Sequence, residues 1–200
     1  MTGVEVALIQ HWWLGPLVTA VVYVSDYYLT IRSARLYHAG GKDYMEVEGS
    51  YELNPTYEAD IDSLRLFSPR LLLSVLATTV FLLAVWLLTV WEPLLPPEFY
   101  FFALGSFVCL QGPIHMRHLQ NLVLFRHAVA GRGVTGGVRF ERWLSLEISA
   151  SGLWMAAAFF LIWFLLTGSW FLLGGAMSCS VVALRQRRLG KQAQNVETNE

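Results

Sequence analysis

Long uncharged apolar runs alternate with charged segments along most of the chain. A helix needs about 20 mainly apolar residues to cross the hydrocarbon core of a bilayer. Five runs approach that length, and proline or glycine residues lie near their ends. The predicted spans are residues 16–32 (extending as far as 37), 68–91, 98–117, 143–166 and 169–185. This pattern predicts an all-α fold, a polytopic bundle of five transmembrane helices.

Two of the predicted boundaries have a clear local signal. Ser68 can cap the second span and Pro69 suits its first position. The last two apolar runs flank Gly168, and one helix through both would be implausibly long, so we predict a tight hairpin. The fifth span is short, because about 17 residues cover only about 25 Å.

Composition supports a membrane location. Charged residues make up 14% of the chain and apolar residues 55%, whereas soluble domains have roughly a quarter charged residues. The net charge of −1 lacks the basic excess of a nucleic-acid-binding protein. Cys109 and Cys179 both lie in apolar runs, so they form neither a disulfide framework nor a metal motif.

The positions of the basic residues predict the orientation. Lysine and arginine are retained in short cytoplasmic loops. All fourteen lie in the connections between spans one and two and between spans three and four, after span five, or at the span ends that border these segments, and the other connections have none. No positive region precedes span one, so we expect no cleaved signal. We therefore predict a multi-pass protein of the plasma (inner) membrane with its N-terminus outside and its C-terminus in the cytoplasm.

The soluble parts are small, so residues 1–190 are predicted to form a single bundle. The cytoplasmic loop 37–67 contains Asn54 and Pro55, a helix-start signal. Apolar residues at helical spacing follow among acidic ones, which predicts an amphipathic helix near 55–67 that docks on the other helices. Residues 131–137 are predicted to be a flexible glycine-rich loop, and 191–200 a disordered polar tail.

Asp26 is the clearest polar residue inside a span. An aspartate at a helix centre costs about 2.5–3.5 kcal/mol unless it faces protein or water. It lies six residues before Arg32, about 9 Å deeper along the helix axis. Polar residues recur on its face at spacings of three and four: Thr19, Tyr23, Asp26, Thr30, Ser33 and Tyr37. The stripe serves either helix packing or a functional site.

Span three contains a second unusual feature. Pro113 inside a helix frees a backbone carbonyl and usually bends the axis. We predict that this bend turns Gln111 and His115 toward the Asp26 face of span one. His115 is a candidate proton acceptor, and with His118 a candidate metal ligand that needs further ligands such as Asp26, Glu147 or His127. The alternative is a kink that serves packing alone.

Glu147 lies five residues inside Arg142 in span four, also near the cytoplasmic boundary. The candidate substrate- or ion-binding residues are therefore Asp26, Thr30, Gln111, His115 and Glu147. Small residues at helical spacing also mark spans three to five, including Gly105, Gly112, Gly152 and Gly174. Such residues let helix backbones approach closely.

Part of the first third of the chain resembles a pattern of uncharacterised small prokaryotic integral membrane proteins. The shared residues are Asp26, Thr30, Gly40, Glu52, Asn54 and Pro55. The resemblance implies a membrane protein and no particular activity. It adds weight to Asp26 and Asn54.

Three functions remain open. The first is binding or transport at a cytoplasm-facing polar site that handles a proton, a cation or a small polar solute. This function implies a homo-oligomer, because five spans are few for a transporter monomer. The second is an accessory or assembly protein with a partner membrane protein. The third is a membrane-embedded enzyme, although the chain lacks the rhomboid serine, HExxH and Walker motifs. No cofactor, catalytic residue or nucleic-acid partner is predicted, and the lipid bilayer is the expected surrounding.

Overall fold

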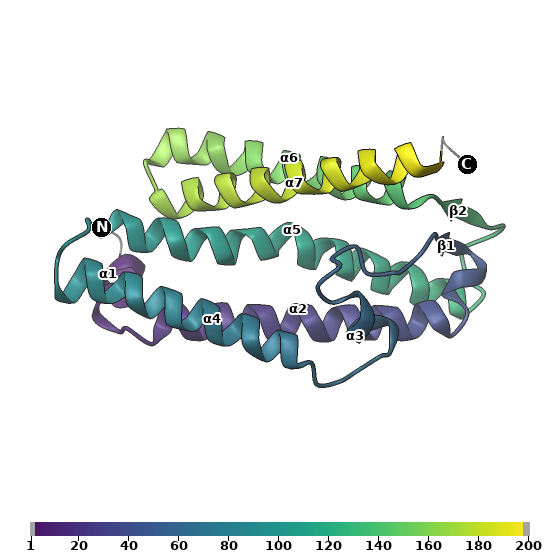
Figure 1. Ribbon diagram of the computed structural model, residues 1–200, viewed down its shortest axis with the longest axis horizontal. Helices are drawn as coiled ribbons and strands as arrows, with labels where there is room; N and C mark the ends of the chain where they lie inside the picture. The colour runs from purple at the N-terminus through teal and green to yellow at the C-terminus, as the bar shows by residue number, and fades with distance from the viewer. Residues whose placement is uncertain (1–2, 198–200) are drawn as a thin grey trace.

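The computed structural model describes residues 3–197 and is dominated by long helices. They are α1 (Gly3–Gln10), α2 (Leu14–His38), α3 (Glu58–Asp62), α4 (Pro69–Trp86), α5 (Glu98–Val129), α6 (Arg142–Thr167) and α7 (Trp170–Glu197). A 3-10 turn, η1 (Gly41–Asp43), follows α2, and a π-helical turn, η2 (Leu87–Trp91), extends α4. The long helices lie side by side along one axis (Figure 1). The predicted all-α class is confirmed.

Within the described residues, four helices are long and apolar enough to cross a membrane: α2, α4 with η2, α5 and α6. Helix α7 is not among them, because its apolar part ends at Arg185 and a polar half follows. It nevertheless runs along α6 and packs against α5 (Figure 1). The chain thus has the helices expected of a membrane protein.

The local boundary signals act as expected. The Ser68 hydroxyl accepts a hydrogen bond from the backbone N–H of Leu71 at 3.2 Å, and Pro69 opens α4. Gly168 ends α6 in the left-handed conformation, with φ of +68°, and α7 begins two residues later. Glycine adopts this conformation without a Cβ clash, so the predicted hairpin is confirmed.

Glycines bring the backbones of α5 and α7 into contact. A Cβ atom at Gly105 would overlap the carbonyl group of Phe171, and one at Gly174 would overlap that of Phe102. The Ser106 hydroxyl donates to the Gly174 carbonyl at 3.2 Å. The small residues of spans three and five thus approach each other's helix, whereas the sequence predicts that they face the small residues of span four. Gly112 and Gly152 do not take part, because a Cβ there would have no neighbour within 4 Å among the described residues.

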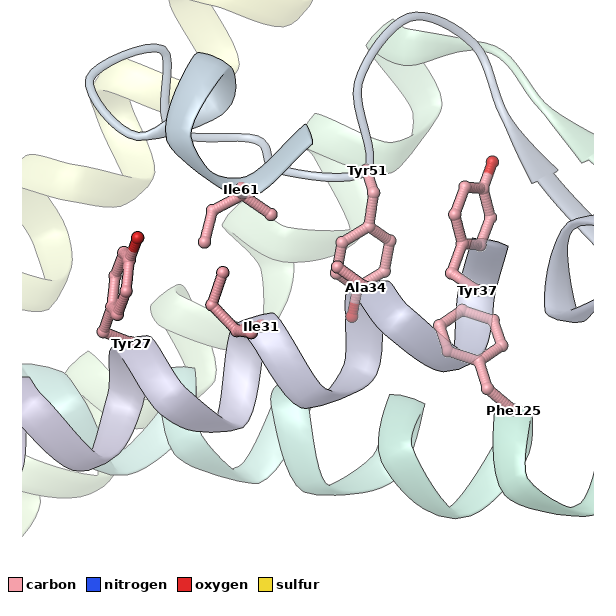
Figure 2. Packing of buried hydrophobic residues seen from close by; sticks show 7 residues of the cluster. All are labelled: Tyr27, Ile31, Ala34, Tyr37, Tyr51, Ile61 and Phe125. Atoms are coloured by element: carbon pink, nitrogen blue, oxygen red, sulfur yellow. The ribbon is translucent and has the colours of Figure 1, made fainter. Parts of the chain in front are cut away.

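The loop between α2 and α4 is anchored on the bundle. Ile61 of α3 points toward α2, and Tyr51 packs with Tyr37 and Phe125 (Figure 2). Ile61 is 1% exposed, so the predicted docking is confirmed.

The helix in this loop is shorter than the predicted 55–67. The Asn54 side chain closes a turn, accepting from the N–H of Thr56 at 3.2 Å, and does not cap α3. The chain leaves α3 after Asp62, because Leu64 adopts a positive φ of 51° and buried Asp60 accepts a hydrogen bond from Ser68 at 2.6 Å. These contacts fold the loop back to the start of α4.

The structure differs from the sequence prediction in two further places, both outside the predicted spans. Strands β1 (Met45–Val47) and β2 (Val138–Phe140) pair in parallel, with Glu46 opposite Arg139. Strands of three residues are too short to show a periodic pattern. Helix α7 continues to Glu197, through most of the predicted tail, and Gly190 lies against Trp143 of α6. The rest of that tail, 198–200, lies outside the described residues.

Candidate functional site

A cavity of about 470 Å³ lies between α2, α4, α5 and α7. Residues 52–57, here called the cover loop, line it from the side of the α2–α4 connection. The volume falls within the roughly 300–1,000 Å³ of small-molecule sites. Its polar lining includes Tyr23, Asp26, Thr30, Glu52, Asn54, Thr78, Gln111, Arg117, His118, Arg185 and Gln186.

The polar features of α2 and α5 meet at this cavity, as the sequence predicts. Asp26 Oδ1 lies 3.8 Å from His115 Nδ1 and 3.6 Å from His118 Nε2. Gln111 lines the same cavity as Asp26. Helix α5 remains helical through Pro113, so regular helical spacing is sufficient to put Gln111 and His118 on one face. His115 touches Asp26 but is not part of the cavity lining.

The hydrogen bonds of His118 fit either neutral form of its ring. The Thr30 hydroxyl lies 2.9 Å from the carbonyl oxygen of Asp26 and 3.1 Å from His118 Nε2. It either donates to the carbonyl and accepts from Nε2, or turns and donates to Nε2. The other nitrogen, Nδ1, is buried and has no hydrogen-bond partner among the described residues. When Nε2 carries the proton, Nδ1 is a free acceptor.

His115 is arranged to hold or release a proton. Its Nδ1 lies 2.9 Å from the Gln111 carbonyl, which can only accept, so Nδ1 carries a proton. Its Nε2 lies 2.8 Å from the Ser25 hydroxyl, which can also donate to the Val22 carbonyl at 2.9 Å. Rotation of this hydroxyl satisfies either protonation state of Nε2. His115 can therefore change charge beside Asp26 without losing a hydrogen bond.

Four buried polar atoms around the cavity lack a hydrogen-bond partner among the described residues. They are Asp26 Oδ1, Gln111 Oε1, His118 Nδ1 and Gln186 Oε1. Buried polar groups are nearly always hydrogen-bonded, and each unsatisfied one costs about 1–3 kcal/mol. Gln111 and His118 are 6% and 4% exposed as whole residues, so contact with the outer surface of the bundle does not satisfy them. A polar occupant of the cavity would.

Charges of both signs border the cavity without direct pairing. Glu52 accepts from the N–H of Asn54 at 2.7 Å, and Arg117 donates to the Ser149 hydroxyl of α6. No ion pair between described residues joins Asp26 or Glu52 to Arg117 or Arg185. The lining therefore offers two carboxylates and two guanidinium groups to a bound molecule.

Burial raises the pKa of Glu52, which lies outside the membrane-spanning segments, above its ordinary value of 4.5. Arg117 and the Asn54 N–H oppose this rise, whereas Asp26 and Asp62 add to it. Because the folded pKa lies above the unfolded one, protonated Glu52 favours the folded cover loop. The stabilisation is fully present below pH 4.5 and is lost as the pH rises through the raised folded value.

We expect hydrogen exchange in the cover loop to become faster as the pH rises above about 4.5, after correction for the intrinsic pH dependence of exchange. Glu52→Gln should remove this added dependence, because glutamine does not titrate. Glu46→Gln is a matched control, since Glu46 forms an exposed ion pair with Lys42 in the α2–α4 connection, outside the cover loop. Equal pH dependence in wild type and Glu52→Gln would contradict the assignment to Glu52.

The structure does not bring Glu147 to the cavity. Its carboxylate accepts from Arg187 of α7 at 3.1 Å, and both side chains are nearly half exposed. Helix α7 packs against both α5 and α6, so the Glu147 surface of α6 meets α7 and not α2. The prediction that Glu147 joins Asp26 is wrong.

The described residues provide no third ligand for a metal site at His115 and His118. Within residues 3–197, no group of three or more histidine, cysteine, aspartate or glutamate side chains could hold a metal ion. His127, one proposed ligand, lines a separate surface hollow with Leu124 and Arg132.

Sequence reasoning missed several lining residues. Glu52, Arg185 and Gln186 approach Asp26 only through the tertiary fold. In the sequence Arg117 indicates only which side of the membrane is cytoplasmic, although it follows Gln111 and Ile114 at helical spacing. One signal was available, because five of the six residues in the prokaryotic resemblance line this cavity: Asp26, Thr30, Glu52, Asn54 and Pro55.

No protein-family model matches the chain. Comparison with curated proteins gives no match, and comparison with solved structures gives none either.

Proposed function

We propose that this chain is an integral membrane protein that binds a small polar solute in a cytoplasm-facing, intramembrane cavity and takes part in its transport. The observation that carries the proposal is the group of four unpartnered buried polar atoms around one cavity. A bundle whose polar residues served packing alone would pair these atoms with donor groups of neighbouring side chains. The cavity therefore favours binding over the accessory and assembly alternative.

The proposal includes five membrane crossings, with α7 as the fifth. The close approach of the α5 and α7 backbones at Gly105 and at Gly174 supports this, because it places α7 beside a helix long and apolar enough to span. The carboxyl ends of α2, α5 and α7 and the amino ends of α4 and α6 lie toward one end of the bundle (Figure 1). The basic residues gather near this end, which we assign to the cytoplasm. The resemblance to prokaryotic membrane proteins supports the plasma membrane.

Reporter fusions test the topology. Fusions after Val90 or Ser169 are expected outside, and fusions after Lys42, Arg132 or Lys191 inside. The reason is that each crossing helix reverses the side of the chain. A cytoplasmic signal from a reporter within residues 92–97 would overturn the five-span arrangement.

Cysteine accessibility tests the cavity itself. In a background with Cys109 and Cys179 replaced by alanine, Thr78→Cys places a thiol on the cavity wall of α4. A membrane-impermeant methanethiosulfonate reagent should label it from the cytoplasmic side. Leu82→Cys is the matched control, one helical turn farther along α4 and fully buried in a hydrophobic cluster. No labelling of Thr78→Cys from the cytoplasmic side would contradict a cytoplasm-facing cavity.

Proton handling is a second candidate function. It is favoured by the hydrogen bonds of His115, which accommodate two protonation states beside Asp26. Such a residue can take up a proton when a charged solute enters and release it when the solute leaves. A homo-oligomer remains part of this proposal, because five helices are few for a complete transport pathway.

A further inference from the structure

We propose that the cavity recognises a zwitterion, a ligand with a primary ammonium group and an anionic carboxylate or phosphate. This inference rests on the proposed binding function and names the chemical class of the ligand. Neither charge alone matches the lining, because two carboxylates disfavour a free anion and two guanidinium groups disfavour a free cation. A ligand that carries both charges can meet both sets of groups.

The unpartnered atoms indicate where the ammonium group binds. Asp26 Oδ1, Gln111 Oε1 and Gln186 Oε1 are hydrogen-bond acceptors. His118 Nδ1 is an acceptor as well in the form of the ring in which Nε2 donates to Thr30. The three oxygens therefore need donors, and an ammonium group meets His118 in this form. An ammonium group supplies three donors and a positive charge, and it suits the neighbouring Asp26 carboxylate.

The two arginines indicate where the anionic group binds. Arg117 has only the neutral Ser149 hydroxyl as its hydrogen-bond acceptor among the described residues. Arg185 of α7 borders the same cavity and joins no ion pair there. Guanidinium groups match carboxylate and phosphate oxygens in geometry. The anionic group is thus expected between Arg117 and Arg185.

Two sources present this chemistry at a membrane. One is a free amino acid, and the other is the headgroup of an ethanolamine phospholipid. The apolar part of the lining, which includes Leu71, Ala77, Ile114 and Val182, can receive an amino-acid side chain or the start of an acyl chain. The experiment has one arm for each source.

The first arm measures binding of three matched probes to the purified full chain: L-leucine, isocaproate, which lacks the amine, and isoamylamine, which lacks the carboxylate. The second arm measures retention of phosphatidylethanolamine against phosphatidylglycerol from mixed-lipid nanodiscs by native mass spectrometry. Loss of one charge–charge hydrogen bond corresponds to a weakening of about 10- to 100-fold. We expect the affinity for L-leucine to exceed that for isocaproate and isoamylamine by at least about tenfold, or the affinity for phosphatidylethanolamine to exceed that for phosphatidylglycerol by the same factor.

Variants assign the two ends of the ligand. Asp26→Asn should reduce the ratio of the affinity for the zwitterion to the affinity for isocaproate or phosphatidylglycerol. Arg185→Gln should reduce the affinity advantage of the zwitterion over isoamylamine, and it should preserve the fold because Arg185 is exposed. Arg187→Gln is the matched control, since Arg187 pairs with Glu147 away from the cavity.

The results separate this inference from the function on which it rests. A single-charge probe that binds as tightly as the zwitterion would overturn the zwitterion proposal and leave the binding function standing. Absence of binding in both arms, with Thr78→Cys labelled from the cytoplasm, would overturn it in the same way. An unlabelled Thr78→Cys would overturn both. Zwitterion selectivity that survives Asp26→Asn and Arg185→Gln would also contradict the assigned site.

Discussion

Gly174→Ala is expected to destabilise the protein by about 1–3 kcal/mol or more, the range of overpacked interiors. The added Cβ would overlap the Phe102 carbonyl oxygen and lie 2.9 Å from the Ser106 nitrogen. Both are backbone atoms of α5, so a side-chain rotation cannot relieve the clash. Helix α7 must then move away from α5 and open the wall of the cavity.

Gly152→Ala is the matched control, because a Cβ at this exposed position of α6 would meet nothing within 4 Å. Alanine should stabilise this helix slightly, by up to about 1 kcal/mol. Thermal unfolding in detergent measures both variants. Equal stability of the two would show that α5 and α7 are not in close contact, and it would remove the support for α7 as a fifth crossing.

Asp26→Asn is expected to fold and insert but to lose most ligand binding, with an affinity decrease of about 10- to 100-fold. Asparagine keeps the shape and one oxygen acceptor, whereas the charge that faces His115 and His118 is removed. Any coupling of binding to proton uptake should disappear in the same variant.

Asp26→Leu distinguishes function from packing. A leucine cannot pair with either histidine, so this variant should be less stable than Asp26→Asn, and circular dichroism with binding measurements compares the two. If Asp26→Leu folds well while Asp26→Asn does not, the role of Asp26 is packing. The transport hypothesis would then lose the support that it draws from Asp26.

The sequence predicts much of the helical architecture because local signals determine it. Ser68 and Pro69 start α4, Gly168 ends α6, and the apolar runs locate the long helices, although α5 and α7 continue beyond their apolar runs. The stripe around Asp26 correctly indicates contact with α5, since an aspartate in a span must face protein or water. These inferences need only residue type and spacing.

The rest of the site depends on long-range packing that spacing does not encode. The position of Glu52 follows from the docking of Tyr51 and Ile61 on α2 and α5. The absence of Glu147 from the cavity follows from the insertion of α7 next to α5 through Gly105 and Gly174. Neither contact is a property of its own segment, so periodicity within one helix cannot reveal it.

The most direct test of the central claim is an experimental density map of the full chain in lipid nanodiscs, recorded with the zwitterion that binds best. The account predicts ordered non-protein density in the cavity within about 3.2 Å of Gln111 Oε1 and His118 Nδ1. It also predicts that Asp26 and Arg117 remain without a direct ion pair to each other. A closed cavity, in which these side chains bond one another and leave no space for a ligand, would contradict the account.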